Sequence, residues 1–132
     1  MTTEAFDLIA LGETMLSLVA ADGDLAVATT FHATHGGAES NACAAFARRG
    51  LRAAWVSRLG ADVAGDRVRA GLTSAGVDLS WARTDPTRPT GLMLRDRHGS
   101  VAYWRAGSAA SALEPADLEG VPLETSRAVL VT

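Results

Sequence analysis

The chain has 132 residues, a formal net charge of −3, a hydrophobic share of 48% and a charged share of 20%. This length suits one domain or part of one, and the composition is that of a globular protein. No apolar run approaches the roughly 20 residues of a membrane helix, and no basic stripe indicates nucleic acid as a partner. The first residues lack a signal-peptide pattern, so we expect a cytoplasmic location and neither a membrane nor a nucleic-acid partner.

The reactive side chains exclude further classes of site. All 12 basic residues are arginine, so a P-loop lysine and a Schiff-base lysine are both absent. His32, His35 and His98 do not cluster with cysteines or carboxylates at metal-ligand spacing, which gives a structural metal little support. Cys43 lies in an alanine-rich helical pattern, which predicts a small buried residue rather than a nucleophile.

The first half of the chain alternates between strand and helix patterns. The apolar run 6–11 predicts a buried strand that ends at a glycine turn, and 15–20 and 27–37 predict extended, partly exposed segments. The alanine-rich segment 38–49 predicts a helix that two glycines precede and Gly50 stops.

The next segments repeat this order and then change it. Residues 52–60 predict a strand, and the following stretch predicts a helix with Val68 and Leu72 on one face, closed by Gly76. Such alternation favours an α/β fold with a parallel sheet, whose ligands gather at the carboxyl ends of the strands. By contrast, 90–105 reads as a β-hairpin, which suggests a flap or lid.

The last segments predict a short helix and a strand. Pro115 suits the first turn of a helix within 114–120, and the apolar run 128–132 predicts a final strand. This strand would lie at an unpaired edge of the sheet.

The stretch "THGGAESNACAAFARRG" is the strongest candidate for a binding site. Gly36 and Gly37 let the backbone approach a ligand, and the helix that follows offers free N–H groups at its start. The amide of Asn41 can both donate to and accept from a polyol. An ordinary glycine turn beside an incidental polar helix face remains an alternative.

A second candidate is "YWRAGSA". Arg105 can bind a carboxylate through two parallel hydrogen bonds from its planar guanidinium. Strand alternation places one of the two aromatic residues, Tyr103 or Trp104, on the same side of the strand as Arg105 and the other on the opposite side. The alternative is a solvated arginine on an edge strand.

Together these residues resemble the ribokinase-like (PfkB) carbohydrate kinases, and most closely the 2-keto-3-deoxygluconate kinases. The matching motifs are "GGAESN" (36–41), Gly50 and Gly60, "GADVAG" (60–65), "LTSAGVD" (72–78), "TGLML" (90–94) and "VAYWRAGSAASAL" (101–113). The resemblance covers nearly the whole chain. It implies a three-layer α/β/α fold of which residues 1–132 are the N-terminal part, with lid strands at about 14–36 and 90–106 and without the ATP-binding and catalytic part.

The resemblance also implies roles for particular residues. Gly37 would contact the sugar through its backbone, with Gly36 shaping the turn, and Asn41 would bind sugar hydroxyls. Tyr103 and Arg105 would hold the acid end, and Glu13, in "LGE", matches an acidic position near the sugar site.

Two positions depart from the pattern. Met93 stands where some ketodeoxygluconate kinases have a tyrosine, and Cys43 stands where the family usually has a small serine, threonine or alanine. The first departure leaves the exact sugar open.

The run "VAGD" (63–66) imitates the family's catalytic Gly-Ala-Gly-Asp motif, in which an aspartate accepts the hydroxyl proton. It lacks the first glycine and lies too early in the chain, so we expect Asp66 not to be the base. Asp62 is instead predicted to cap its helix. The chain would therefore lack catalytic residues and be inactive alone.

The leading hypothesis is a kinase that uses ATP and Mg²⁺ to phosphorylate a sugar or sugar acid, for which this chain supplies the sugar-binding portion. A truncated, non-catalytic sugar-binding protein and a fructose or nucleoside kinase of the same family remain alternatives. A nicotinamide-binding Rossmann domain ranks far below, because "LGETMLS" lacks the glycine fingerprint. The apolar lid residues suggest a homodimer formed through the lid.

Overall fold

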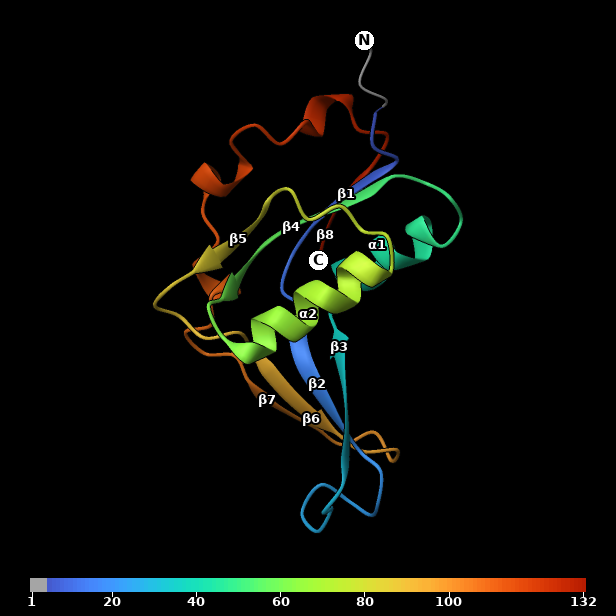
Figure 1. The fold of residues 1–132 in the computed structure, drawn as a ribbon, viewed down its shortest axis with the longest axis vertical. Coiled ribbons are helices and arrows are strands. Elements are labelled where there is room, and N and C mark those ends of the chain that lie inside the picture. The colour runs from blue at the N-terminus through green and yellow to red at the C-terminus, as the bar shows by residue number, and fades with distance from the viewer. Residues whose placement is uncertain (1–4) are drawn as a thin grey trace.

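The computed structural model describes residues 5–132, which form two four-stranded sheets (Figure 1). The strands are β1 (Leu8–Leu11), β2 (Met15–Ala20), β3 (Phe31–Gly36), β4 (Ala53–Gly60), β5 (Ala82–Asp85), β6 (Leu92–Arg95), β7 (Val101–Trp104) and β8 (Val129–Val131). The helices are α1 (Ala38–Ala47) and α2 (Val63–Ser74), and the 3₁₀ turns are η1 (Ala110–Ala112), η2 (Pro115–Leu118) and η3 (Leu123–Thr125).

The main sheet has the strand order β5-β4-β1-β8, and all its pairings are parallel. Helices α1 and α2 both lie on one face of it (Figure 1). Alternate residues of the central strands, such as Leu8 and Trp55, pack there against Val68 and Leu72 of α2. This face holds the larger apolar core of the chain.

The opposite face of the main sheet carries a smaller core. Ile9 and Val56 point to this side and pack against Leu118 and Leu123 from the η2–η3 segment. The alternation of buried side chains to both faces explains why β1 and β4 read as nearly continuous apolar runs. The predicted α/β class with a parallel sheet is confirmed.

The second sheet, which we call the small sheet, has the order β3-β2-β6-β7. Strands β2 and β3 are antiparallel, as are β6 and β7, and β2 joins the two pairs by running parallel to β6 with Leu16 opposite Leu92. The small sheet projects away from the main sheet, toward the bottom of Figure 1. Its strands come from the two segments in which the sequence suggests a lid.

Most predicted elements appear close to their expected bounds, but β5 was not predicted. Its sequence, Ala-Arg-Thr-Asp, contains no apolar run, because only Ala82 of the strand packs in the core and the strand lies at the sheet edge. The short helix expected around Pro115 is a 3₁₀ turn that begins at this proline. A capping box formed by Glu114 and Asp117 closes its N-terminus. Strand β8 lies at the other edge, as expected.

Among the helices of residues 5–132, not one combines the length and the apolar character needed to cross a membrane.

Candidate sugar-binding site

The turn between β3 and α1 carries the paired glycines. A Cβ atom on Gly36 would overlap the terminal methyl of Met93, and one on Gly37 would overlap the carbonyl oxygen of Glu13 and crowd Thr14. Gly37 has a φ of −174°, an extended conformation open to any residue, so close packing explains the glycine there. The backbone of this turn is therefore drawn tightly against its neighbours.

Hydroxyl groups fix the first turn of α1. Thr14 Oγ1 donates a hydrogen bond of 2.6 Å to Ser40 Oγ, which itself donates to the Gly37 carbonyl oxygen at 3.2 Å. Thr14 and Ser40 are both buried. This connection orients the start of α1, and with it Asn41, relative to the turn between β1 and β2.

The hairpin β6–β7 provides the facing wall. Met93 pairs with Tyr103, and Arg95 pairs with Val101, so these four side chains share one face of the small sheet. Arg105 follows directly after β7. The two candidate stretches, which lie more than fifty residues apart in the sequence, thus face each other in space.

Between them lies a cavity of about 330 Å³. Five of the six predicted site residues line it: Gly36, Gly37, Asn41, Tyr103 and Arg105. The other lining residues are Met15, His35, Ala38, Met93, Arg95 and Val101. The volume is at the lower end of small-molecule sites and suits a single sugar.

Glu13 is the predicted residue that does not line the cavity. Its Oε1 lies 2.7 Å from Arg105 Nε, and its Oε2 accepts a hydrogen bond of 2.5 Å from Ser108 Oγ. The Glu13 side chain is only 9% exposed, and it packs close to Gly91. Its contact is therefore with the predicted acid-binding arginine.

Sequence reasoning missed His35 and Arg95 as cavity residues. A signal for Arg95 was present, because strand alternation places it on the same face as Met93 once the hairpin is recognised. His35 gives no such signal, because it pairs with Leu16 on the face of the small sheet opposite Met93, and its ring lies against Gly71 of α2. Burial lowers the pKa of His35, and its Nδ1 has no hydrogen-bond partner among the described residues.

The two aspartates of the "GADVAGD" run have different positions. Asp62 caps α2, accepting a 2.7 Å hydrogen bond from the Gly65 N–H, and its other oxygen accepts one of 2.8 Å from the Thr90 N–H. The predicted cap is confirmed. Asp66 is exposed in the first turn of α2 and does not line the cavity.

Cys43 is fully buried in the core between α1 and the main sheet. Its thiol donates a hydrogen bond of 3.3 Å to the Ala54 carbonyl oxygen, and burial raises its pKa to about 12. A protonated, inaccessible thiol has no nucleophilic character at neutral pH. The structural interpretation of this residue is confirmed.

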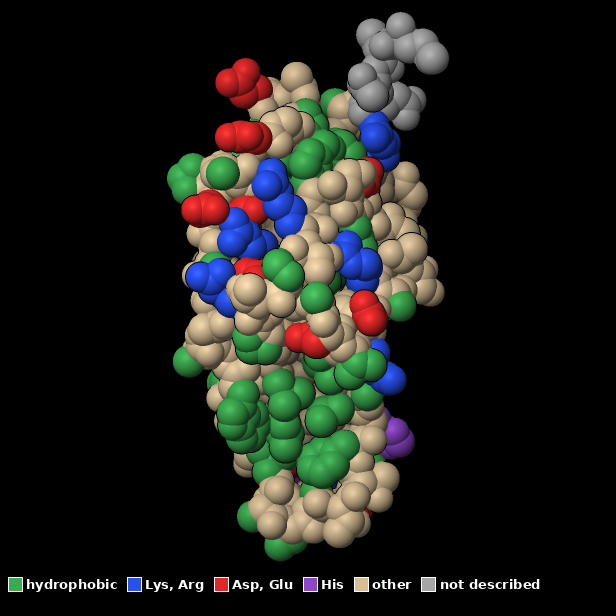
Figure 2. All heavy atoms as spheres, turned by 60° about the vertical axis from the view of Figure 1, so that its left-hand side comes forward, with side chains coloured by type: hydrophobic (Ala, Val, Ile, Leu, Met, Phe, Trp, Pro, Cys, Tyr) green, Lys and Arg blue, Asp and Glu red, His purple; other side chains and the backbone are tan. Residues whose placement is uncertain are grey.

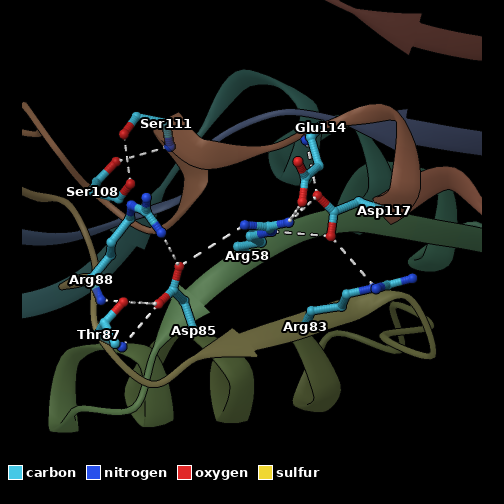
Figure 3. A network of polar contacts seen from close by, with 9 residues as sticks. All are labelled: Arg58, Arg83, Asp85, Thr87, Arg88, Ser108, Ser111, Glu114 and Asp117. Carbon is cyan, nitrogen blue, oxygen red and sulfur yellow. Dashed lines mark hydrogen bonds and ion pairs between the residues drawn. The ribbon is translucent and has the colours of Figure 1, made fainter.

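A polar network holds the segment after the hairpin against the main sheet (Figure 3). Arg58 of β4 lies 2.9 Å from Asp117 and 2.8 Å from Glu114, and Arg83 of β5 approaches Asp117 from the other side at 3.4 Å. Asp85 accepts hydrogen bonds from Thr87 and Arg88 and lies 4.0 Å from Arg58.

The same segment also supports the cavity. Ser108 hydrogen-bonds Glu13, and Ser111 is bonded in turn to Ser108 (Figure 3). The position of Arg105 therefore depends on the segment that the Arg58 network fastens to β4 and β5.

Comparison with known proteins identifies relatives. The family model described as pfkB family carbohydrate kinase matches residues 5–127. The 2-dehydro-3-deoxygluconokinase of Thermoproteus tenax is 34% identical over 92% of this chain and 40% of its own length. That of Bacillus subtilis is 37% identical over 84% of this chain and 36% of its own.

A solved structure agrees. The PfkB protein from Polaromonas sp. JS666 superposes with a TM-score of 0.88 at 38% identity, covering 95% of this chain and 44% of its own. The chain thus spans about two fifths of the length of the relatives it matches, and it corresponds to their N-terminal portion. Its fold is that of the ribokinase-like kinases, and the chain belongs to the pfkB family of carbohydrate kinases.

Proposed function

We propose that the full-length protein uses ATP to phosphorylate a sugar acid such as 2-keto-3-deoxygluconate (2-dehydro-3-deoxygluconate), and that this chain supplies its sugar-binding part. The proposal rests on one observation: Gly36, Gly37, Asn41, Tyr103 and Arg105 all line the same cavity. The names of the Thermoproteus and Bacillus relatives point to the same substrate.

The cavity offers a distinct type of contact to each part of such a substrate. Asn41 and the backbone at the start of α1 can hydrogen-bond hydroxyl groups, and Tyr103 can provide both a ring face and a hydroxyl. Arg105 engages Glu13 through Nε, and its two Nη groups have no partner among the described residues. They remain free to donate to a carboxylate.

Phosphoryl transfer itself requires groups that we do not assign to this chain. Within residues 5–132, no group of three or more His, Cys, Asp or Glu side chains is placed to hold a metal ion. ATP and Mg²⁺ would supply the phosphoryl group and neutralise its charge. The residues of this chain bind and orient the acceptor sugar.

The test is an ATP-dependent phosphorylation assay of the full-length protein with 2-keto-3-deoxygluconate, fructose and ribose. We expect turnover of the keto acid, and a loss of at least tenfold in kcat/KM for Arg105→Ala, since hydrogen bonds to charged groups contribute about 1.5–3 kcal/mol. Turnover of neutral sugars alone would retain the family and refute the sugar acid. Sugar binding without any turnover would indicate a non-catalytic binding protein.

One observation favours a neutral sugar as the second candidate. Arg105 already has a carboxylate partner in Glu13, so its charge is partly compensated before any ligand enters. A fructose or nucleoside kinase of the same family would require no free positive charge in the cavity. The same substrate panel separates the two candidates.

We also propose that the small sheet acts as a lid and mediates a homodimer. Met93 and Tyr103 face the cavity, so strand alternation places Leu92, Leu94 and Trp104 on the opposite face. Trp104 is 58% exposed, and hydrophobic side chains gather over the small sheet in the lower part of Figure 2. An apolar patch on a projecting sheet suits a second copy of the same sheet.

Light scattering at micromolar concentration tests the dimer. We expect twice the monomer mass for the wild-type full-length protein and the monomer mass for Trp104→Asp. A monomeric wild type would refute the dimer. Asp24, which lies outside the sheet in the β2–β3 loop, offers a control position: Asp24→Asn should leave the mass unchanged.

A further inference from the structure

The cavity contains a second arginine that the preceding argument does not use. Arg95 lines it from β6, on the same face of the small sheet as Met93 and Tyr103. We propose that Arg95 is a specificity-determining residue: it provides the uncompensated positive charge that selects an anionic sugar over a neutral one. This inference rests on the proposed function and identifies the charge by which the site would recognise an acid.

The neighbours of Arg95 provide no compensating charge. The residues opposite it in the sheet are Val19 on β2 and Val101 on β7. Among the described residues, its guanidinium forms no ion pair or hydrogen bond. An exposed arginine that lines a cavity and lacks an acidic neighbour across the sheet keeps its full charge for a ligand.

The adjacent Asp96 does not neutralise it. The Asp96 side chain is buried, and its Oδ1 accepts hydrogen bonds of 2.8 and 3.1 Å from the His98 and Ser100 N–H groups. Its Oδ2 accepts a further hydrogen bond of 3.3 Å from the Leu25 N–H. The carboxylate thus organises the hairpin turn, on the side of the strand away from Arg95.

The two cavity arginines therefore have different roles. The charge of Arg105 is balanced by Glu13, whose second oxygen is held by Ser108, so Arg105 is fixed in place and contributes directed hydrogen bonds. Since no acidic residue lines the cavity, its net positive charge comes from Arg95. An incoming carboxylate is attracted by Arg95 and oriented by Arg105.

The test is the KM of the full-length kinase for 2-keto-3-deoxygluconate and for fructose, in the wild type, Arg95→Gln and Arg97→Gln. Arg97 lies two residues further along, in the exposed hairpin turn, and does not line the cavity, so its substitution makes the same change of net charge. We expect Arg95→Gln to raise KM for the acid about tenfold, the loss of one hydrogen bond to a charged group, with kcat nearly unchanged. Arg97→Gln should behave as the wild type.

The dependence of KM on salt concentration provides a second test with the same variants. The KM of the wild type for the acid should rise with ionic strength, because ions screen the attraction to an exposed charge. That dependence should flatten in Arg95→Gln and persist in Arg97→Gln. An acid KM of Arg95→Gln that equals the wild-type value, or equal losses for the acid and for fructose, would overturn the proposal.

Failure of this inference is distinct from failure of the proposed function. A wild-type protein that phosphorylates neutral sugars and ignores the acid refutes both. A wild-type protein that prefers the acid, and retains that preference in Arg95→Gln, keeps the proposed function and refutes the role of Arg95.

Discussion

At the scale of single residues, the two glycines before α1 have different neighbours and should respond differently to the same change. A Cβ on Gly36 meets the end of the Met93 side chain, which can move, but in doing so it must shift within the cavity. We expect Gly36→Ala to fold with nearly wild-type stability and to raise KM for the sugar at least several-fold. Thermal unfolding and steady-state kinetics of the full-length protein measure the two effects.

Gly37→Ala is the matched comparison. Its Cβ would meet the carbonyl oxygen of Glu13, a backbone atom that cannot rotate away as the end of a side chain can, and overpacking of this kind costs about 1–3 kcal/mol. The free energy of unfolding should therefore fall by that amount.

A second substitution tests the cause of the KM effect at Gly36. If Met93→Ala restores the KM of Gly36→Ala, the contact with the Met93 methyl group is the cause; failure of this rescue would place the cause elsewhere.

The Cys43 thiol gives a second prediction at this scale. Burial raises its pKa to about 12, so at pH 8 the native protein should react with a thiol reagent only as fast as it unfolds. The signal to follow is alkylation of the peptide that contains Cys43, with and without denaturant. Rapid labelling in native buffer would show that the helix α1 interface opens.

At the scale of elements, α2 depends on one side chain at its start. Burial raises the pKa of Asp62, but hydrogen bonds from the Thr90 and Gly65 N–H groups outweigh this effect and leave the pKa below its usual value. The carboxylate is therefore stabilised in its charged form. It links the helix to the segment that leads into β6.

Asp62→Ala should lower the free energy of unfolding by about 0.5–2 kcal/mol, the usual range for a lost N-cap. Asp66→Ala is the control, because Asp66 is acidic and in the same first turn but exposed. Chemical denaturation of both variants provides the comparison. Equal losses would mean that the helix dipole, rather than the cap, accounts for the effect.

The elements also show how far the sequence could be interpreted. Helix α1, helix α2 and the hairpin were predictable, since glycine stops and apolar periodicity act within a few residues. Strand β5 was not, because a polar edge strand is defined by its neighbour β4 and carries little local signal.

The site was predictable in the same uneven way. Gly36, Gly37 and Asn41 belong to one local motif, whereas the contact of Glu13 with Arg105 joins residues far apart in the chain. Their ion pair depends on how β1 and β7 are placed in space, and no spacing in the sequence encodes it. The roles assigned to these residues stay predictions until the substrate assays are made.

At the scale of the whole molecule, the Arg58 network links the two halves of the described chain (Figure 3). Burial raises the pKa of Asp117, but its bonds to Arg58 and to the Glu114 N–H outweigh this and lower the pKa overall. Hydrogen bonds from the Thr87 and Arg88 N–H groups lower the pKa of Asp85 as well. Both carboxylates are therefore more acidic in the folded state.

A pH dependence follows. A carboxylate with a lowered folded-state pKa stabilises the protein above its unfolded pKa of roughly 4, and this contribution is lost as pH falls through the folded value. We expect Asp117→Asn to cost about 2 kcal/mol at pH 7 and progressively less below pH 4. Urea denaturation of both proteins from pH 3 to 7 measures the difference, and a constant gap across that range would contradict this account.

The parallel pairing of β2 with β6 has a consequence for the order of folding. In this pairing Leu16 lies opposite Leu92, and Val19 lies opposite Arg95. The small sheet can therefore close only after a long loop has been ordered, and non-local pairings of this kind form slowly. During synthesis the first strands would emerge well before their partners. The cavity walls on β2, β6 and β7 therefore come together late, and the capacity to bind sugar should return after most of the helical signal when the protein refolds.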